Sequence, residues 1–186
     1  NLERSKSSTI HADLGLEKGE YGVLTLHRPS NVDDKDAFAG ILSALEQIGT
    51  RIPLVFPLHP RTKNRAEQFG LTNRLEAIPN IVLTGPAGYL DFVALMADAK
   101  LVLTDSGGLQ EETTALGIPC LTLRENTERP ITVTEGTNTI VGNDPQVILD
   151  AANDALDHGG KAGRIPDLWD GKTAQRIVDI IVNQIG

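Results

Sequence analysis

Short apolar runs alternate with amphipathic stretches along most of the 186-residue chain. The apolar runs have the length of buried strands, and they occupy residues 21–26, 52–58, 81–83, 101–103, 120–123 and 139–141. Between them, apolar positions recur at helical spacing, most clearly over residues 35–48, 90–99 and 144–156. About six alternations of strand and helix are typical of a parallel sheet with helices on both faces. The pattern therefore predicts an α/β, Rossmann-like domain.

The two ends of the chain depart from this pattern. Residues 1–20 are polar and predict an irregular linker. Residues 173–185 predict a final helix with a row of isoleucines on one face, at positions 177, 180, 181 and 185. The whole chain, residues 1–186, is therefore expected to form a single domain preceded by a linker.

The segment from Lys100 to Pro130 organises the rest of the prediction. An apolar strand at 101–103 leads into a Gly-rich turn, and a helix at 109–116 follows the turn. Gly117 and Pro119 end that helix, because glycine favours a helix C-terminus and proline cannot continue one. The next strand starts at residue 120. The order is therefore strand, Gly-rich turn, helix and strand.

The turn carries the chemistry. Gly107 and Gly108 have no Cβ, so a ligand can approach the backbone closely. The unpaired N–H groups and the dipole of the following helix favour an anion there, and Ser106 adds a hydroxyl. Glu112, one turn into the helix, suits the two hydroxyls of a ribose. These residues predict a nucleotide diphosphate site, with a plain tight turn before a capped helix as the alternative.

Several longer strings extend this hypothesis. TDSGGLQEE, GIPCLTLRENTERP and EGTN, together with TLHR, PLHPRT, GYLDFVALM and LWDGKTAQRIV, resemble the signature of the non-hydrolysing UDP-N-acetylglucosamine 2-epimerases. The resemblance covers most of the chain. It implies the two-domain GT-B architecture, with this chain as the C-terminal domain, the N-terminal domain of the same protein as a partner, and a homodimer left open. It also implies interconversion of UDP-N-acetylglucosamine and UDP-N-acetylmannosamine by elimination and re-addition of UDP, without a metal or other cofactor.

The resemblance also assigns roles to individual residues. It implies that His27 is catalytic and faces the phosphate and sugar of the substrate, with Arg28 beside it, and that Arg129 contacts the diphosphate. Ala87 and Phe92 belong to a segment whose backbone holds uracil in the family. With the turn residues, the candidate substrate-binding set is His27, Arg28, Ala87, Phe92, Ser106, Gly107, Gly108, Glu112 and Arg129. The catalytic carboxylates of the family are expected in the N-terminal half.

The residues themselves leave other interpretations open. His27 could be a half-exposed loop histidine, Phe92 could belong to the core, and the stretch from Arg124 to Pro130 could be a solvated loop. The family continues Arg-Glu-Asn after its His-Arg pair, whereas this chain has Pro29-Ser30-Asn31, so the role of the two replaced residues is in doubt. For His59 the activator role known in the family is not carried over, because the residues that follow it differ.

Composition narrows the class of protein. There are 17 basic and 25 acidic residues, giving a net charge of −8, which argues against a nucleic-acid partner. The single cysteine, Cys120, excludes an internal disulfide. No stretch suits a membrane span or a signal peptide, so a cytoplasmic protein is expected, with no membrane partner. Two rival functions remain: the nucleotide half of a GT-B glycosyltransferase, and a UDP-binding module without activity.

Overall fold

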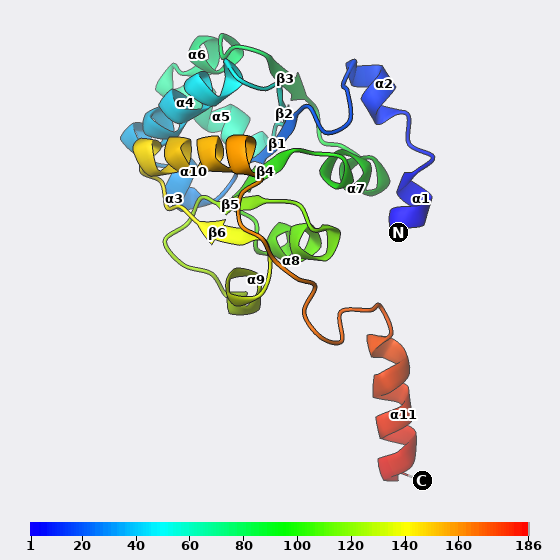
Figure 1. Cartoon of the computed structure of the whole chain (residues 1–186). Helices are drawn as coiled ribbons and strands as arrows, with labels where there is room; N and C mark the ends of the chain where they lie inside the picture. The colour runs from blue at the N-terminus through cyan, green and yellow to red at the C-terminus, as the bar shows by residue number, and fades with distance from the viewer. Residues whose placement is uncertain (186) are drawn as a thin grey trace.

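Six parallel strands form one sheet in the computed structural model, which describes residues 1–185 and the side chains of residues 1–184 (Figure 1). The strands are β1 (Gly22–Thr25), β2 (Leu54–Pro57), β3 (Ile81–Thr84), β4 (Leu101–Thr104), β5 (Cys120–Thr122) and β6 (Asn138–Ile140). Their order is β3-β2-β1-β4-β5-β6, and every pair is parallel. The predicted α/β fold with a parallel sheet is confirmed.

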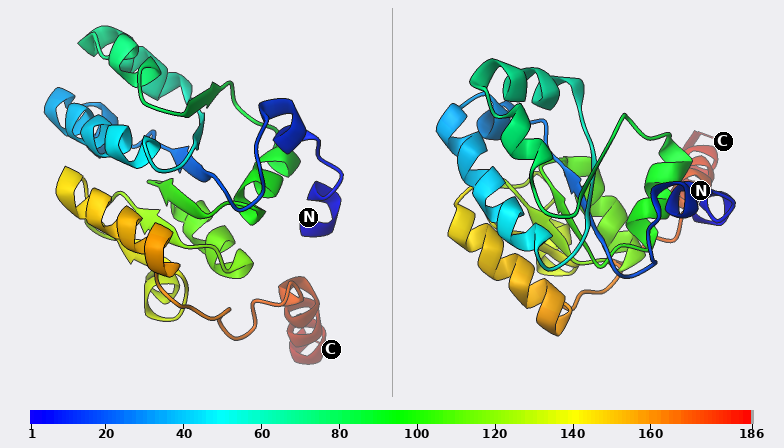
Figure 2. Two further views of the ribbon diagram at one scale, coloured as in Figure 1. Left: turned by 45° about the horizontal axis from the view of Figure 1, so that its top comes forward. Right: turned by 90° about the horizontal axis from the view of Figure 1, so that it is seen from above.

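Helices cover both faces of the sheet (Figure 2). On one face lie α4 (Lys35–Gly49), α5 (Pro60–Phe69), α6 (Thr72–Glu76) and α10 (Pro145–His158), and on the other lie α7 (Tyr89–Ala97) and α8 (Gly107–Leu116). The side chains of successive strand residues point to opposite faces of the sheet, so they pack into two separate hydrophobic cores. Leu24 packs on the α4 side, and Val23 packs on the α7 side.

Local signals explain where the main helices begin. The Asp34 carboxylate accepts a hydrogen bond from the Ala37 N–H and caps α4. Asp144 caps α10 in the same way, and Pro145 occupies the first helical position. Two short helices, α3 (Pro29–Val32) and α9 (Pro130–Thr134), also begin at prolines. Both follow strands of the central sheet and bring their preceding residues to its carboxyl edge.

The first 20 residues are not the irregular linker that their polarity predicts. They contain α1 (Leu2–Ser5) and α2 (Ile10–Leu14), which pack against α7. The Ser8 hydroxyl donates to Asp91 at 2.6 Å, and the imidazole of the buried His11 lies 2.9 Å from the Tyr21 hydroxyl. These partners lie on elements that follow later in the chain, so local sequence patterns do not reveal them.

The last helix, α11 (Thr173–Ile185), stands away from the sheet (Figure 1). Its apolar side chains are about half exposed: Ile177, Val178, Ile180, Ile181 and Val182. This agrees with the predicted row of isoleucines, apart from the side chain of Ile185, which lies outside the described part. An amphipathic helix with its apolar face uncovered is suited to contact with another surface.

Candidate functional site

The strand order reverses between β1 and β4, which pair along their whole length. In α/β sheets, ligands bind beyond the carboxyl ends of the strands at such a switch point. A pocket of 270 Å³ opens there, between the loops that follow β1, β2, β3 and β4. Four of the predicted site residues line it: His27, Ala87, Phe92 and Ser106.

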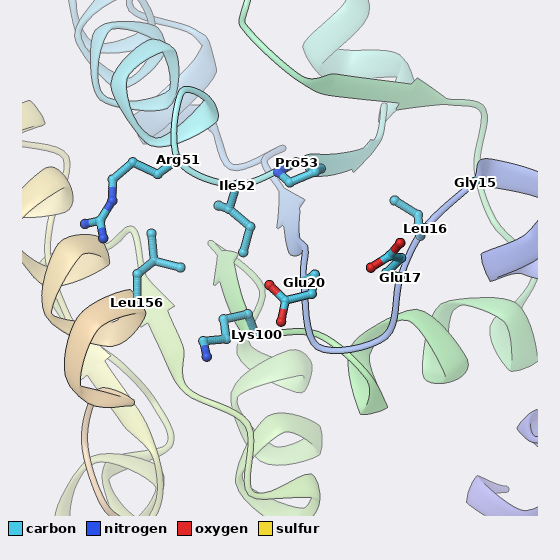
Figure 3. Close-up of a pocket in the computed structure, with 9 residues that line it drawn as sticks. All are labelled: Gly15, Leu16, Glu17, Glu20, Arg51, Ile52, Pro53, Lys100 and Leu156. Atoms are coloured by element: carbon cyan, nitrogen blue, oxygen red, sulfur yellow. The ribbon is translucent and has the colours of Figure 1, made fainter.

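A larger hollow of 720 Å³ lies at the opposite end of the sheet (Figure 3). Pro53 and Lys100, which line it, directly precede β2 and β4, so the hollow is at the amino ends of the strands. Its rim carries charges of both signs, from Glu17, Glu20, Arg51 and Lys100. Size alone would favour this hollow, but topology and the placement of the polar groups favour the smaller pocket at the switch point.

A fully buried carboxylate, Asp105, joins the loops that follow β1 and β4. Its Oδ2 accepts hydrogen bonds from the backbone N–H groups of His27 at 2.8 Å and Arg28 at 2.7 Å. The Asn31 Nδ2 donates to the same oxygen at 3.2 Å. Its Oδ1 lies 2.8 Å from Nδ1 of His27. The carboxylate therefore fixes both the backbone and the ring of His27.

This contact defines the chemical state of the two side chains. Burial raises the pKa of Asp105, but the hydrogen bonds from the His27 ring and from the backbone of Arg28 and His27 outweigh burial, and the pKa lies below its usual value. With Oδ1 of an ionised Asp105 2.8 Å away, the neutral ring is favoured to carry its proton on Nδ1, which leaves the lone pair on Nε2. The ring can thus accept a proton or a hydrogen bond through Nε2 at the wall of the pocket.

Asp105 was not among the predicted site residues. It lies within the TDSGG string, in which the nucleotide diphosphate site was predicted from the Ser and Gly residues. A charged residue directly after a buried strand, Leu101–Thr104, was the available signal, because such a position is buried near the strand's end. Its hydrogen-bond partner His27 lies 78 residues earlier in the sequence, and the two residues meet because β1 lies beside β4.

His59 faces the same pocket from the loop after β2. Its ring centroid is 5.2 Å from that of His27. The Nδ1 of His59 accepts a hydrogen bond from the Arg61 N–H, so His59 caps α5. In a neutral ring, the proton then lies on Nε2, which can donate a hydrogen bond. These contacts favour opposite tautomers in the two neutral imidazoles.

The Gly-rich turn is the first turn of α8, which starts at Gly107 rather than at Leu109. Ser106 is the N-cap residue in extended conformation. A Cβ added at Gly108 would meet open space, and one at Gly107 would come no closer than 3.9 Å to Glu128. The backbone at the start of the helix is thus open to an approaching group, and an anion bound by its first N–H groups stays a prediction.

The two glutamates that follow contact different neighbours. The Glu112 carboxylate lies 3.5 Å from the Tyr89 hydroxyl, and its partial burial raises its pKa above the usual value. The Glu111 carboxylate lies 3.1 Å from Nε of Arg129. Glu111 therefore contacts the arginine that the resemblance implies binds the diphosphate.

Two arginines of the charged loop have distinct partners. Arg124 forms a forked pair with Glu128, at 2.7 and 2.9 Å. Arg129 is 43% exposed, and its Nη1 donates to the Glu128 carbonyl at 3.2 Å. Beside the pocket, Nε of Arg28 is buried with no hydrogen-bond partner among the described residues. Arg28 and Arg129 are therefore the guanidinium groups suited to an incoming anion.

Pro29 and Ser30, which stand where the family has Arg-Glu, begin the short helix α3 after β1. Pro29 occupies the first position of α3, where its missing N–H costs nothing. Ser30 is exposed, whereas Asn31 is buried and also donates to the Leu123 carbonyl at 2.8 Å.

Across residues 1–185, no group of three or more His, Cys, Asp or Glu side chains is arranged to hold a metal ion. In the same range, no helix has the length and apolarity to cross a bilayer.

Comparison with known proteins gives consistent relatives. A family model described as UDP-N-acetylglucosamine 2-epimerase matches residues 1–182. The UDP-N-acetylglucosamine 2-epimerase of Methanococcus maripaludis is 39% identical over 167 residues, which are 89% of this chain and 45% of the relative. The UDP-2,3-diacetamido-2,3-dideoxy-D-glucuronate 2-epimerase of Pseudomonas aeruginosa is 41% identical over 145 residues, 77% of this chain and 39% of that relative.

A solved structure is also similar. It is the UDP-GlcNAc 2-epimerase of Methanocaldococcus jannaschii in complex with UDP-GlcNAc and UDP, with a TM-score of 0.86 and 36% identity. The match covers 98% of this chain and 51% of that one. The chain thus spans about half the length of the proteins it resembles, and its sheet corresponds to one half of a GT-B structure.

Proposed function

The chain belongs to the UDP-N-acetylglucosamine 2-epimerase family, and we propose that it is the C-terminal half of such an enzyme and binds the UDP part of the substrate. The complete protein would interconvert UDP-N-acetylglucosamine and UDP-N-acetylmannosamine. The other half would supply the acid and base that act at C2 of the sugar. The isolated chain would bind nucleotide without turnover.

The observation that carries this proposal is the pocket at the β1–β4 switch point. One pocket is lined by His27, Ala87 and Ser106 from three separate loops and by Phe92 from α7, beside the open N-terminus of α8. Its largely apolar wall suits a flat base, and the accessible N–H groups of Gly107 and Gly108 suit a diphosphate. This arrangement supports a nucleotide ligand over a plain capped helix.

The ribose and the phosphates would be bound by a carboxylate on α8 and by two arginines from neighbouring loops. The Glu112 carboxylate, one turn inside the helix, would accept the two ribose hydroxyls, with Tyr89 at its side. Arg129 and Arg28 would approach the phosphates, and Arg129 would exchange its Glu111 partner for a phosphate oxygen. An acidic chain thereby binds an anion through a small set of local donors.

In the proposed reaction, a base removes the proton from C2 while the bond between C1 and the UDP oxygen breaks. A glycal and UDP result. UDP then returns to C1, and a proton is added to the opposite face of C2. The departing diphosphate gains negative charge, so donors fixed in place stabilise the transition state. His27, held by Asp105, would donate from Nε2 to the phosphate after taking up a proton.

The exposed apolar face of α11 is proposed to contact the other half of the protein. Five of its apolar residues are about half exposed, and the helix stands off the sheet. Covering such a face removes apolar area from water, which stabilises an association by roughly 25 cal/mol per Å² before its costs. This supports the N-terminal domain of the same protein as a partner.

A second candidate substrate is a related UDP-sugar. The Pseudomonas aeruginosa relative, named for UDP-2,3-diacetamido-2,3-dideoxy-D-glucuronate, is as similar to this chain as the epimerases of the archaea. The UDP part would bind in the same way, and the sugar would differ. Proton NMR of the complete protein with each UDP-sugar distinguishes the two, since only the true substrate shows inversion at C2.

A titration of UDP and uridine against the chain and its Arg129→Lys variant tests the nucleotide site. Lysine keeps the charge but lacks the fork that binds phosphate. We expect the variant to weaken UDP binding and leave uridine binding almost unchanged. Failure of the unmodified chain to bind UDP would refute the proposal. Robust inversion at C2 by the isolated chain would instead refute the division of labour between the halves.

A further inference from the structure

Beneath the Arg129 loop lies a group of buried polar side chains that the proposed site does not use. Gln110 on α8, Thr132 on α9 and Asn138 at the start of β6 are all fully buried. Burying an amide is unfavourable unless its groups are hydrogen-bonded. The hydrogen bonds that these three residues make therefore indicate what the group is for.

Both backbone polar groups of Arg129 are bound to threonine hydroxyls. Its N–H donates to Oγ1 of Thr127 at 2.9 Å. Its carbonyl accepts from the hydroxyl of Thr132 at 2.7 Å. The backbone at the position of the guanidinium is therefore held from both sides.

Each threonine is bound in turn to a buried amide. The Thr127 hydroxyl donates to Oε1 of Gln110 at 2.5 Å. The Asn138 Nδ2 donates to Oγ1 of Thr132 at 3.0 Å. Each hydroxyl thus accepts one hydrogen bond and donates another, which defines the direction of the whole chain of bonds.

The chain of bonds closes on itself through the two amides. The Asn138 Nδ2 also donates to Oε1 of Gln110, at 3.2 Å. Both amide hydrogens of Asn138 are then used, and its Oδ1 accepts from the Thr122 hydroxyl of β5 at 2.6 Å. The closed set, which we call the polar ring, consists of Gln110, Thr127, Arg129, Thr132 and Asn138.

We propose that Gln110 and Asn138 are positioning residues that hold Arg129 at a fixed place relative to the start of α8. Gln110 lies on the helix whose first turn offers the N–H groups, two residues before Glu112. The polar ring therefore fixes the backbone from which the guanidinium extends, relative to the helix N-terminus, and both groups are proposed to bind the same diphosphate. This inference rests on the proposed UDP site, in which Arg129 is the member of the polar ring proposed to contact the nucleotide.

Variants of Thr127 test the role of the polar ring. Thr127→Val keeps the shape of the side chain but removes the hydroxyl that joins Arg129 to Gln110. Thr127→Ser keeps that hydroxyl and should rescue the function. Gln110→Met removes the acceptor of the ring with little change in length. The matched control is Thr113→Val, which removes a buried hydroxyl outside the polar ring, one that lies on α8 and donates to the backbone of its own helix.

Calorimetric titrations with UDP and with uridine give the readout, alongside thermal melts. We expect Thr127→Val and Gln110→Met to weaken UDP binding by about three- to tenfold, the range for loss of one or two neutral hydrogen bonds. Uridine binding should change by less than about twofold, because uridine has no phosphate for Arg129. Thr127→Ser and Thr113→Val should keep the wild-type ratio of the two affinities.

The outcomes separate this inference from the proposed function. If the wild-type protein binds no UDP, the proposed site is wrong and the positioning role falls with it. If the wild type binds UDP but Thr127→Val leaves the ratio of UDP to uridine affinity unchanged, the polar ring only supports the fold. Thr127→Val decides this even if Gln110→Met does not fold.

Discussion

Replacing Asp105 by Asn isolates the effect of one buried negative charge on His27. The substitution keeps the size of the side chain and one carbonyl oxygen, which can still accept from the N–H groups of His27 and Arg28. It places an NH₂ group where Oδ1 now lies 2.8 Å from Nδ1 of His27. Two donors cannot face each other, so Nδ1 must become an acceptor and the ring proton must move to Nε2.

The loss of stability follows from the hydrogen bonds to Oδ2. Three N–H groups donate to this oxygen, from His27, Arg28 and Asn31. A bond to a charged group is worth about 1.5–3 kcal/mol, and a neutral one about 0.5–1.5 kcal/mol, so each bond weakens by about 1 kcal/mol. Relief from burying a charge compensates part of this sum. We expect the free energy of unfolding to fall by about 2–3 kcal/mol at pH 7.

The pH dependence gives a second signature. The pKa of Asp105 is lower in the folded chain than its usual value of about 3.9. A lowered pKa means that the stabilisation is present above the unfolded-state pKa and is lost as the pH falls through the folded-state pKa. The difference in unfolding free energy between wild type and Asp105→Asn should therefore shrink below about pH 4.

Urea unfolding at several pH values measures the free energies, and ¹⁵N NMR of the imidazole distinguishes the tautomers. Asp36→Asn is the control, because Asp36 is an exposed carboxylate in the first turn of α4. A wild-type tautomer in Asp105→Asn would refute the assignment of the His27 proton. A loss of stability no larger than that of the control would refute the role of the buried charge.

Three further predictions concern single side chains. Glu112→Gln should weaken UDP binding by about ten- to a hundredfold in a calorimetric titration, because the ribose hydroxyls lose a charged acceptor; an unchanged affinity would remove Glu112 from the site. Glu111→Gln should strengthen UDP binding by about two- to fivefold in the same assay, since it removes a carboxylate that competes for Arg129; weaker binding would contradict this. Burial lowers the pKa of His11, so the unfolding free energy should decrease as the pH falls below about 6.5, and His11→Gln should flatten that dependence in urea titrations; an equal slope in both proteins would count against it.

The sequence predicts those parts of the fold whose cause is local. The six strands are identified by short apolar runs, and the helices between them by apolar residues at helical spacing. Both patterns arise because the buried face of each element requires apolar side chains at regular positions. Gly117, Asp34 and Asp144 mark helix ends through their own chemistry. The boundary of α8 was less clear, since Gly107 and Gly108 are poor helix formers that still occupy its first turn.

Contacts between distant segments could not be predicted in the same way. Asp105 binds residues that precede it by more than 70 positions, and this requires knowing that β1 lies beside β4. The docking of residues 1–20 likewise depends on α7. The pairing of Glu111 with Arg129 depends on how the loop after β5 folds over α8. The Arg124–Glu128 pair differs from these contacts, because its two residues are only four positions apart.

The junction made by Asp105 has a consequence for the kinetics of ligand capture. Because one buried carboxylate joins the loops after β1 and β4, the two walls of the pocket cannot separate without breaking its hydrogen bonds. UDP would then enter a preorganised surface and lose little affinity to the ordering of loops. We therefore expect nucleotide association with the isolated chain to be fast and to follow a single exponential.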